Sequence, residues 1–316
     1  MNALEAAGSL SPELRRDFAV VVPAYNEAPV IPELIAALKK AFREYQLEGE
    51  VILVDDGSSD GTADLAEGEG EGWSNLRVLR HRSNFGKTEA IVTAAEATDR
   101  AYLVLFDADL QHLPEEIPRF LAKLQEGWDV VTGRKMGEYQ KPVVSGIYNW
   151  LSRRIFDVPV SDLNSMKAFR REVVDQLPMR HDWHRFFVVM AHARGYSVSE
   201  IDIDLHPRRA GVSKYSGRLR IFVGLIDLLS VWFLLLFSRK PMILFGFSGF
   251  ALTVLGGVVG VVALYLRFVA GMGFRPLLYL VILLETVGVV LLGVGLLAEM
   301  VAQLHHEIDS LRRRLK

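Results

Sequence analysis

The sequence predicts an α/β domain built on a mostly parallel sheet, followed by helices that lie along a membrane and two helices that cross it. Two features of the chain predict this arrangement. Short apolar runs alternate with helical patterns from Phe18 to about Trp128, which is typical of a parallel sheet with helices on both faces. Charged residues are frequent up to Lys240 and nearly absent from Pro241 to Ala298. The first part of the chain is therefore expected to face water and the second part to lie in a membrane.

The elements of the first part follow from the period of the apolar residues. Runs of four to six apolar residues predict strands, and apolar residues that recur every three or four positions predict helices. A further strand is expected later in the chain, at residues 198–205. In chain order the other expected elements are strand 18–22, helix 30–45, strand 51–54, helix 62–67, strand 76–79, helix 87–97, strand 102–106, helix 114–126 and strand 129–132.

Two stretches of the second part are long enough and apolar enough to cross a membrane. Residues 241–266 contain no charged residue, and Glu285 is the only charged residue of 276–298. Each is near the roughly 20 residues that span the apolar core of a bilayer. Because a carboxylate is costly there, Glu285 is expected to face protein. Glycines in both stretches favour close helix packing, and we expect a homo-oligomer.

The segment before the first span is expected to lie in the membrane interface. Residues 221–237 are apolar but carry Asp227, and a short basic linker joins them to the first span. If this segment crossed the membrane, the basic C-terminal tail would be exported, which the positive-inside rule disfavours. A buried core helix of the polar domain is the alternative.

These observations predict an integral membrane protein whose polar domain and two termini are cytoplasmic. The N-terminus has no basic start followed by an apolar run, so no signal peptide is expected. The expected parts are a cytoplasmic domain at 1–213, interfacial amphipathic helices at 214–240, two transmembrane helices at 241–300 and a basic cytoplasmic C-terminal helix at 301–316.

Composition excludes several classes of function. The net charge is -2, so the chain offers no basic field for nucleic acid. It contains no cysteine, which excludes disulfides, thiolate metal sites and thiol nucleophiles. Neither a Gly-Lys-Ser/Thr phosphate loop nor a Gly-x-Gly-x-x-Gly fingerprint occurs, so P-loop NTPases and dinucleotide enzymes are poorly supported.

Polar clusters follow four of the expected strands. Ligands of parallel sheets bind beyond the carboxyl ends of the strands, and these clusters stand there. Any one of them alone would be weak evidence, because ordinary turns use the same residue types. The clusters are PAYNE at 23–27, DDGSSDGT at 55–62, NFGK at 84–87 and DADLQ at 107–111.

The last of these clusters predicts a metal site. Asp107 and Asp109 lie two apart, so in an extended segment they share a face, with Gln111 next in that register. Carboxylate and amide oxygens are suitable ligands for Mg²⁺ or Mn²⁺. Such an ion keeps coordination positions open for the oxygens of a diphosphate. The alternative is an aspartate that caps the following helix. Asp55 and Asp56 could hold a base, a ribose or the same cation.

In this order and spacing, the motifs PAYNE, DDGSSDGT, NFGK and DADLQHLPEE resemble those of the family 2 glycosyltransferases, which have the GT-A fold. The stretch HPRRAGVSKYSGRLRIFVGLIDLLSVWFLLLFSRKPMILFGFSG, followed by two spans, resembles the polyprenyl-phosphate glycosyltransferases of the dolichol-phosphate mannose synthase and GtrB type. The resemblance extends over both the polar domain and the two spans.

The resemblance implies a role for each cluster, with Mg²⁺ or Mn²⁺ as the cofactor. Asp162, ahead of the segment KAFRRE, is implied as a catalytic residue together with Asp109 and Arg134. Met166 departs from the small residue common at its position. The implied contacts are Pro23, Tyr25, Glu27 and Asp55 to the nucleoside, Asp56, Lys87 and Asp107 to the donor, Asp107, Asp109 and Gln111 to the metal and diphosphate, and Arg134, Arg209 and Lys214 to the acceptor phosphate.

For the basic residues of KAFRRE, at Lys167, Arg170 and Arg171, a solvated helix start is the alternative reading. Residues 136–144 follow the corner at Arg134, and their apolar residues show neither the helical nor the strand period. We expect this segment to form a lid over the donor.

The implied reaction is an inverting transfer of a single sugar from a nucleotide-sugar, UDP-glucose or GDP-mannose, to a polyprenyl phosphate at the cytoplasmic membrane face. The metal would stabilise the leaving diphosphate. A phosphate monoester is mostly dianionic at neutral pH and hardly needs a general base, so Asp162 is expected to orient the acceptor or the sugar.

Two alternatives stay open. One is a processive polysaccharide synthase of the same fold, for which a longer membrane channel and a Gln-x-x-Arg-Trp motif are missing. The other is a non-catalytic membrane scaffold with a transferase-like domain, against which the intact DADLQ motif argues.

Overall fold

The computed structural model describes residues 2–136, 160, 162–163, 165–177, 186–206, 241–273 and 275–315. The expected lid from residue 137 onward and the expected interfacial helices at 214–240 lie outside these residues. The chain divides into two compact units, Met1–Ile226 and Asp227–Lys316.

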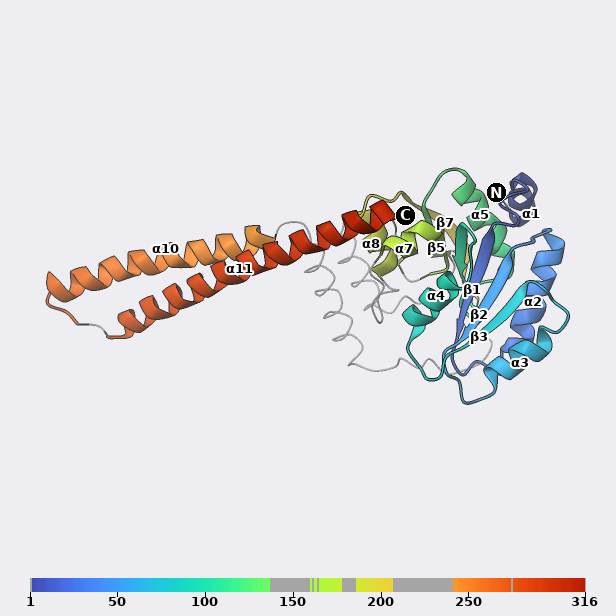
Figure 1. The fold of residues 1–316 in the computed structure, drawn as a ribbon, viewed down its shortest axis with the longest axis horizontal. Coiled ribbons are helices and arrows are strands. Elements are labelled where there is room, and N and C mark those ends of the chain that lie inside the picture. The colour runs from blue at the N-terminus through green and yellow to red at the C-terminus, as the bar shows by residue number, and fades with distance from the viewer. Residues whose placement is uncertain are drawn as a thin grey trace. The chain divides into compact units, whose positions relative to one another are not determined.

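The first unit is built on a seven-stranded sheet with the strand order β3-β2-β1-β4-β6-β5-β7 (Figure 1). β6 is antiparallel to both of its neighbours, and the other adjacent strands are parallel. The predicted α/β class with a mostly parallel sheet is therefore confirmed. The strands are β1 Phe18–Ala24, β2 Glu50–Asp55, β3 Leu76–Arg80, β4 Tyr102–Leu105, β5 Val130–Met136, β6 Lys167–Arg170 and β7 Val198–Asp204.

The helices of this unit cover both faces of the sheet. α1, α2, α3 and α5 lie on one face, and α4, α7 and α8 lie on the other (Figure 1). The bounds are α1 Ala3–Ser9, α2 Ile31–Glu44, α3 Thr62–Glu69, α4 Lys87–Glu96, the 3-10 helix η1 Pro114–Glu116, α5 Ile117–Gln125, α7 Arg171–Gln176 and α8 Phe187–Ala193.

The central strand β1 shows why this layered arrangement is stable. Its residues Phe18 to Val22 are fully buried, because neighbouring strands cover its edges and helices cover both of its faces. Val20 and Val22 pack under α2, whose apolar residues Leu34 and Leu38 recur along one face of the helix. Residues buried on both faces produce a continuous apolar run, which is why this strand is readable from the sequence.

Two local predictions are corrected by the fold. The helix expected at 114–126 begins as the 3-10 turn η1 and becomes α-helical only at Ile117, with Pro118 in its first turn, where a missing backbone N–H is tolerated. The alternative reading of Lys167 and Arg170 as a solvated helix start is wrong, because these residues form β6, although α7 does begin at Arg171.

The second unit contains two helices that are long and apolar enough to cross a membrane, as predicted. They are α10 Pro241–Phe268 and the first part of α11, Arg275–Leu304. α11 continues without interruption to Leu315, so the basic C-terminal segment extends the second span instead of forming a separate helix.

Glycines allow α10 and α11 to approach closely. A Cβ added at Gly249 would lie 2.7 Å from the carbonyl oxygen of Gly288, and one added at Gly256 would lie 2.8 Å from Oε1 of Glu285. The carboxyl group of Glu285 therefore lies against the backbone of the neighbouring helix. This contact agrees with the expectation that Glu285 faces protein.

Candidate functional site

The order of the strands opens a crevice at the carboxyl end of the sheet. From β1 the chain moves outward to β2 and β3 and then returns to β4 on the other side of β1. The loops after β1 and β4 therefore leave in different directions, and ligands of open parallel sheets bind at such a point. The PAYNE cluster follows β1 and the DADLQ cluster follows β4, so the strand order brings both to this crevice.

The loops after β1 and β2 are joined by hydrogen bonds between them. The backbone N–H of Asn26 donates to Oγ of Ser58 at 2.8 Å, and the N–H of Ser59 donates to Oδ1 of Asn26 at 2.9 Å. The N–H of Glu27 donates to Oγ1 of Thr62 at 2.9 Å. Asn26 adopts a positive φ of 51°, which asparagine tolerates better than most residues. These bonds fix the path of the loop that carries Tyr25.

The residues expected at the nucleoside lie along this loop and at the end of β2. Tyr25 is 36% exposed, Pro23 and Glu27 are partly buried, and Asp55 is 5% exposed. The carboxylate of Asp55 accepts hydrogen bonds from the backbone N–H and the hydroxyl of Ser58. The structure thus brings all four residues to one end of β1 and β2, with Tyr25 the most accessible of them.

The carboxylate of Asp56 is buried and bonded to other residues of the protein. Asp56 is 3% exposed, and its carboxylate accepts from the backbone N–H of Phe85 at 2.9 Å and of Gly86 at 2.8 Å. Nδ1 of His81 lies 2.8 Å from the same carboxylate, and Nε2 of His81 lies 2.9 Å from the hydroxyl of Thr93. Asp56 therefore shapes the turn that leads into Lys87, a role that its position directly after a strand does not reveal.

Lys87 and Asp107 form an ion pair across the crevice. Lys87 is the first residue of α4, and its ammonium donates to Oδ1 of Asp107. The side chain of Asp107 is 42% exposed. Partial burial would raise the pKa of Asp107, but the ammonium of Lys87 lowers it far below its ordinary value. Two clusters that are 20 residues apart in the chain thus meet in one charge pair.

The segment 107–111 is a turn, so the extended register predicted for it is wrong. Leu110 has a positive φ of 52°, and Oδ1 of Asp109 accepts from the backbone N–H of Gln111 at 3.2 Å. The alternative of a helix cap is wrong as well, because Leu113 occupies the N-cap of η1 without a side-chain hydrogen bond. Asp109 is 8% exposed, whereas the side chain of Asp107 is partly exposed.

The residues present fit a divalent cation that is shared with a substrate. Among the described residues no group of three or more His, Asp or Glu side chains could hold a metal by itself. Mg²⁺ is ordinarily held by one or two carboxylates together with waters and substrate phosphates, so such a cluster is not required. Asp107 and the neighbouring Asp109 are two carboxylates that could serve as these ligands, with Gln111 in the same turn.

His112 is a residue of this site that the sequence reasoning missed. It is 5% exposed, and its Nδ1 has no hydrogen-bond partner within the described part of the chain. Burial lowers its pKa to about 4, although Asp107 and Asp109 act in the opposite direction. His112 is therefore a neutral imidazole beside the carboxylates at neutral pH. Its position directly after the DADLQ cluster is the signal that could have identified it.

Asp162 lies at the same end of the sheet and is held by three neighbours. Its carboxylate lies 3.6 Å from the ammonium of Lys135, its carbonyl accepts from the hydroxyl of Thr132 at 3.2 Å, and its N–H donates to Glu200 at 3.1 Å. Asp162 is 8% exposed. Thr132 and Lys135 belong to β5, so the end of that strand fixes the segment before β6.

Arg134 is directed away from Asp162. Its guanidinium makes two hydrogen bonds to the carboxylate of Asp202 on β7, at 2.6 and 2.9 Å. The ammonium of Lys135 lies near Asp162, whereas the guanidinium of Arg134 is held by Asp202. Lys135 is thus the basic residue of β5 at this site. Arg209 and Lys214 lie outside the described residues.

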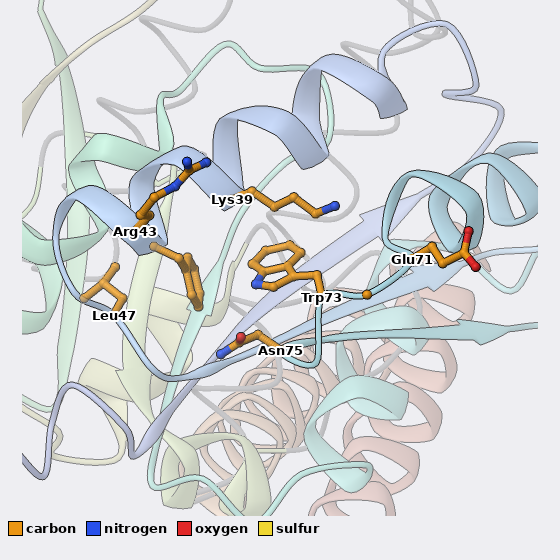
Figure 2. Close-up of a pocket in the computed structure, with 8 residues that line it drawn as sticks. Lys39, Arg43, Leu47, Glu71, Trp73 and Asn75 are labelled. Carbon is orange, nitrogen blue, oxygen red and sulfur yellow. The ribbon is translucent and has the colours of Figure 1, made fainter.

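A separate hollow of about 410 Å³ lies at the opposite end of the sheet (Figure 2). Phe42 of α2 and Trp73, which precedes β3, contact edge to face at 5.4 Å inside it. Lys39 lies 6.0 Å from the Trp73 ring. Because it lies at the amino ends of β2 and β3, this hollow does not belong to the site formed by the polar clusters.

Comparisons with known proteins extend over both units. The sequence profile described as glycosyl transferase family 2 matches residues 19–194. A dodecaprenyl-phosphate galacturonate synthase of Rhizobium johnstonii is 31% identical and covers 96% of this chain and 93% of its own length. An undecaprenyl-phosphate 4-deoxy-4-formamido-L-arabinose transferase of Proteus mirabilis is 29% identical and covers 92% of this chain and 90% of its own.

A solved structure shares the fold of the first unit. Glucosyl-3-phosphoglycerate synthase from Mycobacterium tuberculosis, in complex with Mn²⁺, UDP and glucosyl-3-phosphoglycerate, superimposes with a TM-score of 0.56. The two sequences are 20% identical, and the match covers 72% of this chain and 82% of the synthase. At this identity the likeness establishes the fold alone.

Proposed function

This chain belongs to glycosyl transferase family 2, and on that premise we propose that it transfers a single sugar from a nucleotide-sugar to the phosphate of a polyprenol. One observation carries the proposal. The relatives that match more than nine tenths of the chain, both spans included, are named for different sugars but for the same class of acceptor, a polyprenyl phosphate. The acceptor is thus the shared feature of the full-length relatives.

At the donor end, Pro23, Tyr25, Glu27 and Asp55 contact the nucleoside, since they line one end of β1 and β2. A bound Mg²⁺ or Mn²⁺ supplies positive charge to the leaving diphosphate. Asp107, Asp109 and Gln111 hold the cation and the diphosphate, and Lys87 contributes a further positive charge. Asp56 acts through the backbone of the turn before Lys87.

At the acceptor end, Asp162 orients the lipid phosphate or the sugar. A phosphate monoester is mostly dianionic at neutral pH and is itself the nucleophile, so the site has little need for a base. A single displacement inverts the anomeric centre. Positive charge must hold the lipid phosphate close to the donor diphosphate, and Arg134, Arg209 and Lys214 are proposed for this task. Arg134 must exchange Asp202 for the phosphate, whereas Lys135 already lies beside Asp162.

We propose a small set of donors for the transferred sugar. UDP-glucose and GDP-mannose are the first donors to test, together with the nucleotide-activated forms of galacturonate and 4-deoxy-4-formamido-L-arabinose, which the relatives' names suggest. The catalytic domain and both termini are proposed to be cytoplasmic, where nucleotide-sugars are made, and the glycine-rich helices are proposed to pair with further copies of the chain.

The test uses the full-length protein in detergent with undecaprenyl phosphate and each donor, Mg²⁺ or Mn²⁺ being present. Chromatography should show one sugar per lipid. Chains of several sugars would favour a processive synthase. Equal transfer to water-soluble acceptors would contradict the lipid acceptor, and the absence of turnover with any donor would favour a non-catalytic scaffold.

The acceptor contacts are tested by varying the lipid at saturating donor. Arg209→Ala and Lys214→Ala should lower turnover in detergent by weakening the use of the lipid phosphate while donor binding is retained. Lys123→Ala, which removes a partly exposed lysine of α5 that pairs with Glu126, is the control. If these residues only attract anionic headgroups, at about 1 kcal/mol per charge, the variants will turn over like the wild type once in detergent.

A further inference from the structure

Lys167 is a buried cation at the edge of the sheet that carries the site. It opens β6, where its Cα pairs with Leu105 at the end of β4 and with Thr132 near the end of β5. β6 is antiparallel to both strands, so its amino end lies at the same edge as their carboxyl ends. The side chain is 2% exposed. Lys167 thus lies beneath the segments that carry Asp107 and Asp162.

The burial of this ammonium group is costly. The ammonium group has three N–H donors, and within the described residues it donates to the carbonyl oxygen of Ser165 at 2.9 Å. Burial, with Lys87 and Lys135 nearby, lowers the pKa of Lys167 to about 7 against the attraction of the two aspartates. Methionine would fill nearly the same space without a charge, and the lowered pKa shows that the surroundings of Lys167 disfavour its charged form. Groups that a fold retains at such a cost mark functional sites.

The charges around Lys167 are balanced in a definite pattern. Lys87 pairs with Asp107, and Lys135 pairs with Asp162. Lys167 is attracted by both of these aspartates and repelled by both lysines, and it has neither aspartate to itself. When Lys167 is protonated, the ammonium groups of Lys87, Lys135 and Lys167 balance the carboxylates of Asp107, Asp109 and Asp162. Removing Lys167 would therefore leave an excess of one negative charge beside the place where donor and metal meet.

We propose that Lys167 is a positioning residue that, when protonated, makes the site accept a metal-diphosphate complex in preference to a metal ion alone. The inference rests on the proposed function. A free divalent cation is attracted by Asp107 and Asp109 but repelled by Lys167. A diphosphate is repelled by the carboxylates and attracted by Lys167. Removing this charge should therefore strengthen the binding of the metal ion alone and weaken the binding of the diphosphate. Loss of a purely structural lysine would not affect the two ligands in opposite directions.

The experiment measures both ligands on the full-length protein in detergent. Binding of Mn²⁺ alone is followed by electron paramagnetic resonance, and binding of UDP and of GDP at saturating Mn²⁺ is followed by calorimetry. Lys167→Met is compared with the wild type, with Lys167→Arg, which keeps the charge, and with Lys123→Met, which removes a lysine on α5 that pairs with Glu126.

For Lys167→Met we expect Mn²⁺ alone to bind more tightly and the nucleoside diphosphate that the wild type binds to bind less tightly. Each change should be at least about tenfold, because at an effective dielectric near 20 two unit charges about 12 Å apart already interact by about 1.4 kcal/mol, which is a factor of ten. The melting temperature should stay the same or rise, and Lys167→Arg should restore both affinities. Lys123→Met should resemble the wild type.

Unchanged or weaker binding of Mn²⁺ alone by Lys167→Met would overturn the proposal, as would a parallel loss of both affinities. Lys167→Gln is the second neutral variant. If both neutral variants fail to fold while Lys167→Arg folds, the charge is structural and the proposal is wrong. The Mn²⁺ measurement needs no acceptor or sugar, so its outcome is separate from a failure to transfer sugar to undecaprenyl phosphate.

Discussion

Asp56→Ala is the change with the most definite structural consequence. The wild-type carboxylate accepts two backbone N–H groups, from Phe85 and Gly86, and contacts Nδ1 of His81. Alanine supplies no acceptor, and at 3% exposure water cannot replace the carboxylate without opening the turn. The turn before Lys87 should therefore loosen, and the ammonium that pairs with Asp107 should lose its fixed position.

The size of the effect follows from the hydrogen bonds lost. A buried donor left without a partner costs about 1–3 kcal/mol, so two backbone donors and the His81 contact give a loss of at least about 3 kcal/mol. Asp56→Asn keeps one acceptor oxygen and should cost roughly half as much. Since domains are stable by only about 5–15 kcal/mol, Asp56→Ala should melt well below the wild type but still fold.

The assay combines thermal unfolding in detergent with hydrogen exchange at the amides of Phe85 and Gly86. Both amides should lose protection in Asp56→Ala. The control is Asp64→Ala, an aspartate that is 76% exposed and paired with Arg80, for which a change within about 0.5 kcal/mol is expected. If Asp56→Ala melts with Asp64→Ala and the two amides stay protected, the carboxylate does not hold the turn.

Three further predictions concern the site and its supporting turns. Asp109→Ala should abolish transfer while the protein stays folded, and EDTA should act similarly, whereas full activity in metal-free buffer would exclude a metal at the aspartates. Gly57→Ala should cost at least about 2 kcal/mol, because Gly57 has a φ of 73° and a Cβ there would lie 2.5 Å from the backbone carbon of Ser83. Gly61→Ala, with a φ of 84° but open space around it, should cost less, and equal melting temperatures would refute the steric argument. Burial lowers the pKa of His112 from its ordinary 6.5 to about 4 in the fold. The unfolded chain therefore binds more protons between these two pH values, and the stability of the fold should decrease as the pH drops from 6.5 to about 4. The slope from this group is at most about 1.4 kcal/mol per pH unit, and an unchanged pH profile in His112→Gln would contradict the assignment.

The sequence alone was sufficient for the elements whose signal is local. β1 and β2 are buried on both faces, so each reads as an uninterrupted apolar run, and α2 shows its buried face through the spacing of its apolar residues. The two spans are readable for the same reason, because a membrane imposes length and apolarity on every residue of a crossing helix. The polar clusters at the strand ends were also readable, since a parallel sheet places them at one edge.

Tertiary structure decided which face each polar side chain takes and which group it meets. The strand β6 escaped prediction because Lys167 and Arg170 are charged, and their burial depends on strands β4 and β5, which lie far away in the sequence. Arg134 and Lys135 are adjacent cations, and only the neighbouring strand determines that Lys135 meets Asp162 while Arg134 meets Asp202.

The two aspartates after β2 show the same division between sequence and fold. Asp55 and Asp56 have the same local signal, yet Asp56 is turned inward by the loop that follows β3. The sequence therefore determined the family, the sheet, the spans and the places where polar residues gather. The fold alone determined the partners of those residues, because ion pairs and hydrogen bonds join atoms that lie close in space and far apart along the chain.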